Sequence, residues 1–189
     1  METITEVIGL PGAGKTHYVG GKQVLVKGRA CRYWWALLFS IKHPKIAWHF
    51  LYKTVRTPQV RPALKNKALF LLFGAFAREY KARPGQIIDE GLYQYILSLY
   101  EVTVSRKAVK DDITILAPLR RGVLHFRTDE TIRESRMQER GRWFSKNLSK
   151  AETERFLVSL KETEMYLAEL LQEQANYEVY NRNHHGDFN

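Results

Sequence analysis

The stretch at residues 9–16, GLPGAGKT, combines residue types that bind phosphate groups. It reads as a glycine, four residues, a second glycine, a lysine and a threonine, which is the phosphate-loop pattern. Glycines let backbone N–H groups approach phosphate oxygens that a Cβ atom would keep away. We therefore predict that the loop binds a nucleoside triphosphate through Gly9, Gly12, Ala13, Gly14, Lys15 and Thr16.

Two side chains of this loop have separate predicted roles. Lys15 supplies a compact positive charge for the outer phosphates, and Thr16 supplies a hydroxyl group for Mg²⁺. The apolar residues within 4–8 suit a short buried strand before the loop, and residues 15–19 can open a helix whose positive N-terminal end faces the anion. The alternative is a glycine-rich turn that contains Lys and Thr by chance.

Two acids, Asp89 and Glu90, end the predicted strand at residues 86–91. Ligands of parallel α/β sheets lie at the carboxyl ends of the strands, so we expect both acids beside the phosphate loop if this strand neighbours the first. One carboxylate, with Asp89 as the metal-binding candidate, would hold Mg²⁺ directly or through water, and the other would accept a proton from an attacking hydroxyl group. The alternative is that Asp89 only caps the helix that starts near Gly91.

A series of arginines follows the predicted strand at residues 121–127. Arg133, Arg136 and Arg140 are three and four residues apart, so one helix face would carry them, and Arg142 follows a glycine that offers a hinge. A closing arginine neutralises the charge on a phosphoryl group in transfer, and we expect at least one of Arg136, Arg140 and Arg142 to do so. The alternative is a solvated helix face whose arginines pair with Glu130, Glu134 and Glu139.

These candidate residues need a scaffold, and the apolar pattern predicts strands alternating with helices. Such an order indicates one α/β domain over residues 1–189, with a parallel sheet covered by helices on both faces. Between the strands lie a helical insert at about 32–83 and a lid at about 128–148. The expected strands are 4–8, 23–27, 86–91, 121–127 and 176–181, and the expected helices begin at 15 and cover 32–40, 44–54, 62–81, 92–100, 128–140 and 149–174, the last with the capping-box spacing of Ser149 and Glu152.

Length and cysteine usage are typical of a cytoplasmic protein. The 189 residues suffice for a core without disulfides, and the single cysteine, Cys31, allows neither an internal bridge nor a cysteine-based zinc cluster. The start of the chain has no secretory signal, and the longest apolar stretches fall short of the roughly 20 residues that span a bilayer. We expect a cytoplasmic protein, either soluble or peripheral at a membrane surface.

The net charge of +10 is concentrated in the helical insert. Residues 20–88 contain fourteen basic residues, one acid (Glu79) and many aromatic residues. This mixture fits an anionic small-molecule pocket, a nucleic-acid groove or an amphipathic face on lipid, and the alternative is an aromatic core under solvated lysines. For the run at 33–35, Tyr-Trp-Trp, we expect buried packing, with a membrane anchor as the alternative. For His125 we expect a hydrogen-bonded core position.

Taken in order, GLPGAGKT, IIDEG and VLHFRTDETIRESRMQERGR resemble the P-loop small-molecule kinases, the group that includes thymidylate, adenylate and deoxynucleoside kinases. The resemblance implies a three-layer α/β fold with a five-stranded parallel sheet, an acceptor site among the helices of the insert, and an arginine-bearing lid. It also implies that the donor is ATP with Mg²⁺, and that Arg182, after the last strand, lies near the base of the nucleotide. Members of the group often carry an arginine after the acid of the third strand, where this sequence has Glu90 and Gly91.

The acceptor is predicted only as a class. A carboxylate base favours a hydroxyl acceptor, whereas the basic insert favours an acceptor that carries phosphate or carboxylate groups or is presented at an anionic membrane surface. Both fit the phosphorylation of an alcohol on a small, glycan or nucleoside-type acceptor, anionic or lipid-linked. Two alternatives stay open: a nucleoside monophosphate kinase, and a nucleotide-binding switch or nucleic-acid-associated ATPase. Nucleic acid is the less favoured partner, because the chain has no recognisable recognition module.

Overall fold

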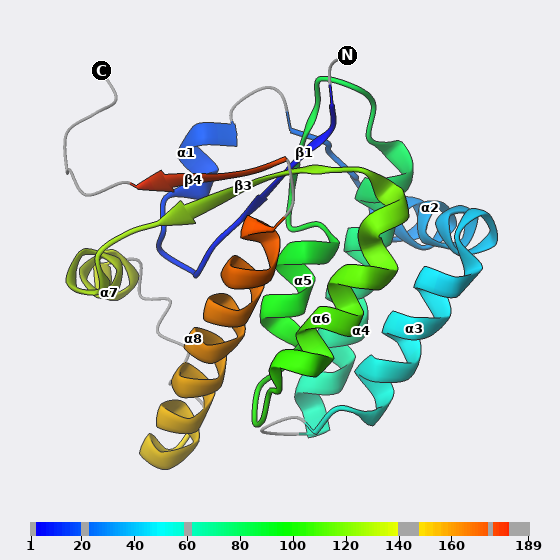
Figure 1. The fold of residues 1–189 in the computed structure, drawn as a ribbon. Coiled ribbons are helices and arrows are strands. Elements are labelled where there is room, and N and C mark those ends of the chain that lie inside the picture. The colour runs from blue at the N-terminus through cyan, green and yellow to red at the C-terminus, as the bar shows by residue number, and fades with distance from the viewer. Residues whose placement is uncertain (1–2, 20–22, 59–61, 140–147, 174–175, 182–189) are drawn as a thin grey trace.

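The computed structural model describes residues 3–19, 23–58, 62–139, 148–173 and 176–181, and it has an α/β architecture (Figure 1). Its strands are β1 (Thr5–Ile8), β2 (Ile87–Asp89), β3 (Gly122–Arg127) and β4 (Tyr177–Asn181). They form one parallel sheet in the order β2-β1-β3-β4. The strand that ends in the acidic pair therefore neighbours the strand that leads into the phosphate loop.

The expectation of five strands is wrong for the part of the chain that the structure describes. In the segment predicted as a strand at 23–27, Gln23 forms an isolated bridge to Ile87, and the Val24 N–H donates to the Ile87 carbonyl at 3.0 Å. This segment lies at the edge of the sheet beside β2, which is only three residues long. The short neighbour offers few backbone partners, so pairing stops after one bridge.

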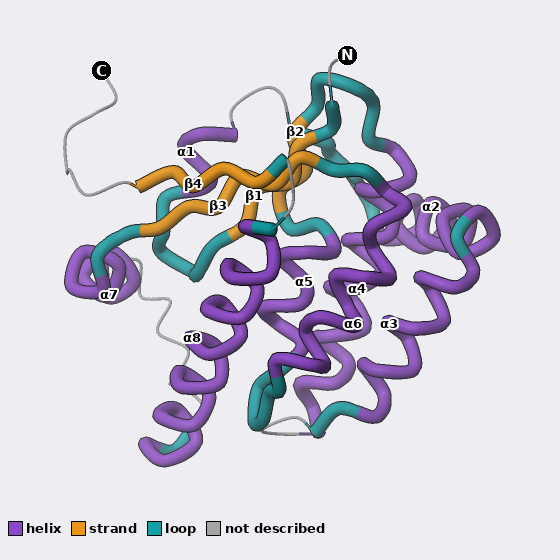
Figure 2. The backbone as a smooth tube through the Cα atoms, in the orientation of Figure 1, coloured by secondary structure: helices purple, strands orange, loops and turns teal. Residues whose placement is uncertain are grey.

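Helices cover both faces of the sheet (Figures 1 and 2). On one face α1 (Lys15–Val19) packs over a small cluster of Val7, Ala13, Val19, Leu124 and Phe126. The other face carries the main core, to which α5 (Leu92–Leu99), α6 (Arg106–Leu116) and α8 (Lys150–Gln172) contribute. Because side chains alternate along a strand, β1 and β3 supply residues to both clusters. The helix α8 begins with the predicted capping box of Ser149 and Glu152.

The helix α6 was not expected from the sequence. It begins after Ser105, whose hydroxyl accepts a hydrogen bond from the Ala108 N–H at 3.2 Å, and it buries Val109, Ile113 and Leu116. That spacing of four and three residues is the signal that could have identified it. A short 3₁₀ turn, Ala117–Leu119, then leads into β3.

The insert consists of three helices, α2 (Arg29–Lys42), α3 (Pro44–Arg56) and α4 (Pro62–Lys81). A buried polar cluster ties α3 to α6: Asp112 accepts hydrogen bonds from Lys53 at 2.5 Å and from the Tyr100 hydroxyl at 2.7 Å, and lies 2.6 Å from His49 Nε2. The insert is therefore fixed to the body of the protein by charge as well as by apolar packing.

The aromatic run of the insert is not buried as expected. Tyr33 and Trp34 are 49% and 57% exposed, while Trp35 stacks on Tyr80 with ring centroids 5.5 Å apart. The periodicity of α2 explains the difference, because Ala36 and Phe39 are the side chains that it buries. Among the described residues, no helix is long and apolar enough to cross a membrane.

Candidate functional site

The loop after β1 has a backbone conformation that suits glycine. Gly9, Gly12 and Gly14 have φ values of 143°, 88° and 89°, which residues with a Cβ atom rarely adopt. At Gly9 space is restricted as well, since a Cβ atom would lie 2.4 Å from the Phe126 carbonyl oxygen. The close approach of β1 and β3 thus requires a glycine at this position.

Three hydrogen bonds from other elements hold the loop. The Gly9 N–H donates to the side-chain oxygen of Gln94 on α5 at 3.0 Å, and the Thr128 hydroxyl donates to the Ala13 carbonyl at 3.2 Å. From α7 (Glu130–Glu139), Arg136 donates to the Gly12 carbonyl at 3.5 Å. The arginine-bearing helix thus contacts the loop directly through Arg136.

Lys15 lies at the start of α1 and folds back along the loop. Its ammonium group donates to the carbonyl groups of Gly9 and Leu10. Burial lowers the pKa of Lys15, and the negative charges of Asp89, Glu90 and Glu164 oppose that shift. An ammonium group with few solvent contacts attracts an incoming anion strongly because little water screens its charge, and the anion in turn favours the charged form of Lys15.

Asp89 ends β2, directly beside the loop-bearing strand, where its register partner is Val7. Its Oδ1 atom is buried and has no hydrogen-bond partner among the described residues. Burial raises the pKa of the Asp89 carboxyl group, and the charge of Lys15 is the largest opposing influence. A buried carboxylate oxygen without a partner fits the binding of Mg²⁺ or of a substrate hydroxyl proton.

Glu90, the second predicted acid, lies differently. Its backbone is in the left-handed region, with φ 61°, and its side chain is 57% exposed. The guanidinium group of Arg78 on α4 donates to the Glu90 carboxylate at 2.8 Å and to its backbone carbonyl at 3.1 Å. Of the two acids, Asp89 is therefore the better candidate for a reactive group. The ion pair of Glu90 with Arg78 joins the end of β2 to the insert.

Gly91, directly after the acidic pair, has no room for a side chain. A Cβ atom at this position would lie 2.5 Å from the Cδ atom of Glu6, which is fully buried. The insert supplies guanidinium groups to the same region. Arg32 of α2 lies with its guanidinium carbon 4.0 Å from the centre of the Phe70 ring, and its Nε atom is buried without a partner among the described residues.

Arg32 and Arg78 form a pair of like charges. Both side chains lie close to Gly74 of α4. A Cβ atom on this glycine would lie 3.2 Å from the Arg78 Nη1 atom and 3.9 Å from Arg32. Burial and the charge of Arg78 lower the pKa of the Arg32 guanidinium group. An anionic group bound here would relieve their repulsion, so we treat this pair as a candidate anion site next to Glu90.

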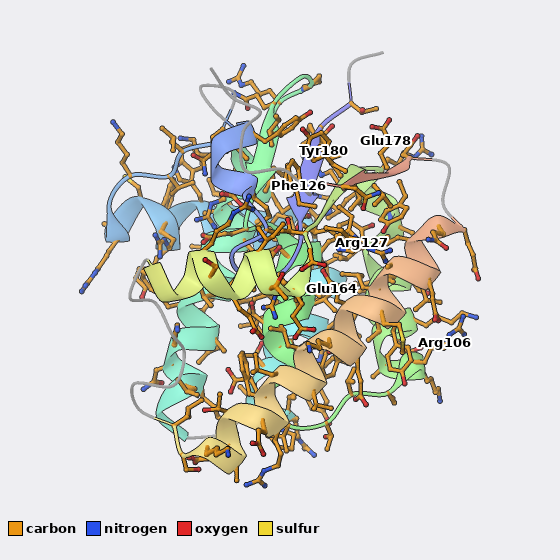
Figure 3. All side chains as sticks on the ribbon, turned by 90° about the vertical axis from the view of Figure 1, so that its left-hand side faces the viewer. Arg106, Phe126, Arg127, Glu164, Glu178 and Tyr180 are labelled. Carbon is orange, nitrogen blue, oxygen red and sulfur yellow. The ribbon has the colours of Figure 1, made fainter. Side chains whose placement is uncertain are left out.

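A cavity of about 280 Å³ opens on the other side of the loop. It lies between the loop, the end of β3, α7 and α8, and Figure 3 shows Arg127 and Glu164 near this region. Arg133, only 4% exposed, turns toward the loop and not to solvent. The cavity is lined by Leu10, Ala13, Phe126, Arg127, Thr128, Arg133, Lys161, Glu164 and Met165.

His125 lies behind this cavity in the buried position that was expected. Its Nε2 atom is 2.9 Å from Glu164, and its Nδ1 atom is 2.7 Å from the hydroxyl group of Tyr177. Both ring nitrogens therefore have partners, and one of these partners, Glu164, lines the cavity.

Some predicted site residues lie outside the described part of the chain. These are Arg140, Arg142, Arg182 and the side chain of Thr16. Among the described residues, no group of three or more His, Cys, Asp or Glu side chains could hold a metal ion. A magnesium ion bound with a nucleotide takes many of its ligands from phosphates and water, so a single carboxylate with a hydroxyl group remains a fitting donor set.

The sequence analysis did not identify five residues of the candidate site that the structure shows: Gln94, Thr128, Glu164, Arg32 and Arg78. Each acts across the fold, as in the bond between Gln94 and Gly9, which are 85 residues apart. Comparison with known protein families and with curated proteins finds no match for this chain. The functional argument therefore rests on the geometry of the site.

Proposed function

We propose that this protein is an ATP-dependent phosphotransferase of the P-loop kinase type that transfers the γ-phosphoryl group to a hydroxyl group of an anionic acceptor. The observation that carries the proposal is the electrostatic interaction between Lys15 and Asp89. The partly buried ammonium group of the loop and the partly buried carboxylate at the end of the adjacent strand each raise the fraction of the other that is charged.

The donor would bind through the backbone N–H groups of residues 12–16, with Lys15 at the outer phosphates. Thr16 would hold Mg²⁺, which supplies charge neutralisation between the phosphates, and Asp89 would contact the ion only through water, so that its carboxylate stays free to accept a proton. Arg136 already reaches the loop at Gly12, and Arg133 lines the adjoining cavity. These arginines, with Arg140 and Arg142 as further candidates, would balance the charge that spreads over the transferring group.

Asp89 is the favoured proton acceptor. In the proposed step its carboxylate takes the proton of the acceptor hydroxyl group, the oxygen forms a bond to the γ-phosphorus, and the bond from that phosphorus to the bridging oxygen breaks to release ADP. Burial raises the pKa of Asp89 toward the working pH, which is the property of an effective general base. Glu90 holds the guanidinium group of Arg78 on the insert side of the site, where the acceptor would bind.

The Arg32 and Arg78 pair supports an acceptor that carries a negative charge. These two guanidinium groups favour an acceptor with a phosphate or carboxylate group, such as a phosphorylated sugar, a lipid-linked glycan or a nucleotide derivative. The same pair supports the second candidate function, a nucleoside monophosphate kinase, in which the acceptor phosphate itself would occupy this position.

The test measures ATP consumption by the purified protein with Mg²⁺, alone and with nucleosides, nucleoside monophosphates, sugar phosphates and lipid-linked glycans. Stimulation by an alcohol supports the proposal, stimulation only by monophosphates favours the second candidate, and acceptor-independent hydrolysis would indicate a switch or ATPase. Asp89→Asn should lower kcat by about 10²-fold or more, whereas the neighbouring Glu90→Gln should mainly raise the acceptor KM. Equal effects of the two substitutions would contradict the assignment of Asp89 as the base.

A further inference from the structure

The helices α2 and α3 carry an exposed aromatic and aliphatic surface that nothing in the described protein covers. Both helices pack on α4 with one side, burying Ala36 and Phe39 from α2 and Phe50 from α3. They form one side of the molecule, on the right in Figure 1, away from α7 and β4. The exposed apolar side chains, here called the α2–α3 face, are Tyr33, Trp34, Leu37 and Ile41 of α2 and Trp48, Tyr52 and Val55 of α3.

The spacing of these residues shows that the face is continuous along each helix. Trp34, Leu37 and Ile41 are three and four residues apart, as are Trp48, Tyr52 and Val55, so each set lies on one side of its helix. Exposure is high at the ends of these rows, with Ile41 at 67% and Trp48 at 72%. An apolar surface of this kind is costly in water and marks an interaction site.

Basic residues lie on the same two helices as the face, and the two helices have no acidic residue. Arg29, Lys42, Lys45 and Arg56 are exposed. The guanidinium group of Arg56 lies over the ring of Tyr52, 4.9 Å from its centre. Tryptophan and tyrosine rings next to lysine and arginine are the composition that binds at the boundary between anionic headgroups and acyl chains.

Two other occupants fit these residues less well. A second copy of the chain would bring two basic surfaces together without a carboxylate from either helix to neutralise them. A nucleic acid would use the cations and aromatic rings, but it would leave Leu37, Ile41 and Val55 exposed without a partner. Acyl chains accept such side chains and anionic headgroups neutralise the cations, so a lipid surface satisfies the charges and the aliphatic residues together.

We propose that the α2–α3 face docks the protein on an anionic lipid bilayer, with Trp34 and Trp48 inserted at the headgroup level. The inference needs no enzymatic activity and does not depend on the proposed function. If both hold, α2 carries Trp34 toward the bilayer and Arg32 toward Phe70 and Arg78, so one helix would join the membrane surface to the acceptor side of the site.

Vesicle binding tests the proposal directly. The full chain is mixed with vesicles of phosphatidylcholine, with or without phosphatidylglycerol, and binding is followed by co-sedimentation and by quenching of tryptophan emission with brominated lipid. We expect binding that requires phosphatidylglycerol and weakens with salt. The double substitution Trp34→Ser, Trp48→Ser should weaken it by about tenfold or more, and Lys45→Gln with Arg56→Gln by about tenfold.

The matched control is Val158→Ser, which removes an exposed apolar side chain from α8. This variant should bind vesicles like the unchanged protein, and circular dichroism should give the same unfolding temperature for all variants. Absence of binding to anionic vesicles, or equal binding by the tryptophan variant, overturns the proposal. Self-association, or binding to single-stranded DNA, that is lost in the tryptophan variant while vesicles are not bound would assign the face to one of those partners instead.

Discussion

The surroundings of Asp89 and Glu6 differ, although both are buried carboxyl groups on adjacent parallel strands. Glu6 lies under the first turn of α5, where its carboxylate accepts the N–H groups of Gln94 at 2.7 Å and of Tyr93. Asp89 lies at the open end of the sheet, with Lys15 as its largest attractive charge. Each of the two carboxyl groups has one buried oxygen atom without a hydrogen-bond partner among the described residues. Burial raises the pKa of both groups, so the raised pKa alone does not identify the functional one.

What separates the two regions is access. The region of Glu6 also contains Glu79, whose carboxylate accepts hydrogen bonds from Arg121 at 2.7 and 3.0 Å. Glu6 and Glu79 are almost completely buried, Arg121 pairs with Glu79, and burial together with the charge of Glu79 raises the pKa of Glu6. Asp89 and Lys15 lie beside the glycine-rich loop instead. In the proposed function, the buried groups of one region stabilise contacts and those of the other serve a ligand.

The largest expected effect is a loss of activity in the region of Asp89 and Lys15. Lys15→Ala removes the ammonium group at the phosphates and should lower ATP turnover by about 10³-fold or more. The free energy of unfolding, measured with urea, should change by no more than about 1 kcal/mol, because the ammonium group is desolvated and its bonds are to loop carbonyl groups. Loss of folding, or full turnover, would show that Lys15 belongs with the structural charges.

The second effect should appear in stability alone. Arg121→Met leaves Glu79 buried without its guanidinium partner, and a carboxylate left without compensation costs about 3 kcal/mol. Urea unfolding measures the loss, and Arg120→Met, at the neighbouring residue, is the matched control with an expected change within about 0.5 kcal/mol. Turnover per folded molecule should stay unchanged. A selective loss of kcat in Arg121→Met would join the two regions into one functional unit.

A third test probes the contact between the acidic strand end and Glu6. Gly91→Ala places a methyl group against the Glu6 carboxylate and should destabilise the protein by about 2 kcal/mol. The double variant with Glu6→Ala should lose less than the sum of the two single changes, because the clash is then removed. Additive losses measured by urea unfolding would mean that the backbone, and not this contact, requires a glycine.

The smallest effect concerns pH. Burial raises the pKa of Glu6 well above its ordinary value, so the folded protein keeps a proton that the unfolded chain releases. Its stability therefore falls as pH rises from the ordinary pKa of glutamate to the raised one. Glu6→Gln should flatten this decline by about 1 kcal/mol across the interval, with a remaining slope from Glu79, whose pKa is also raised. An unchanged profile would show that Glu6 does not carry the proton.

The sequence predicted the elements whose signals are local. The phosphate loop, the acidic strand end at Asp89 and the capping box at Ser149 each depend on a few neighbouring residues, and the structure has the parallel strands and helices that they require. The predicted strand at 23–27 failed because a strand needs a partner of matching length, and β2 is short. The length of the partner strand is a property of the sheet, so residues 23–27 alone could not show it.

The contacts that complete the candidate site were not predictable in the same way. Gln94 reaches Gly9 because α5 starts directly after β2, and Arg32 meets Arg78 because α2 packs on α4. The exposure of Trp34 likewise depends on which side of α2 faces α4. Periodicity indicates that a helix has two sides, but the neighbouring elements decide which side is covered.

The left-handed backbone of Glu90 has an energetic consequence for the end of β2. A glycine would adopt φ 61° without the cost of about 1 kcal/mol that a larger side chain pays there. With glutamate in this place the turn is less stable than it could be, and the carboxylate is held against Arg78 of the insert. The bonds from Arg78 therefore offset part of the backbone strain at Glu90, and the end of β2 depends on the insert for its stability.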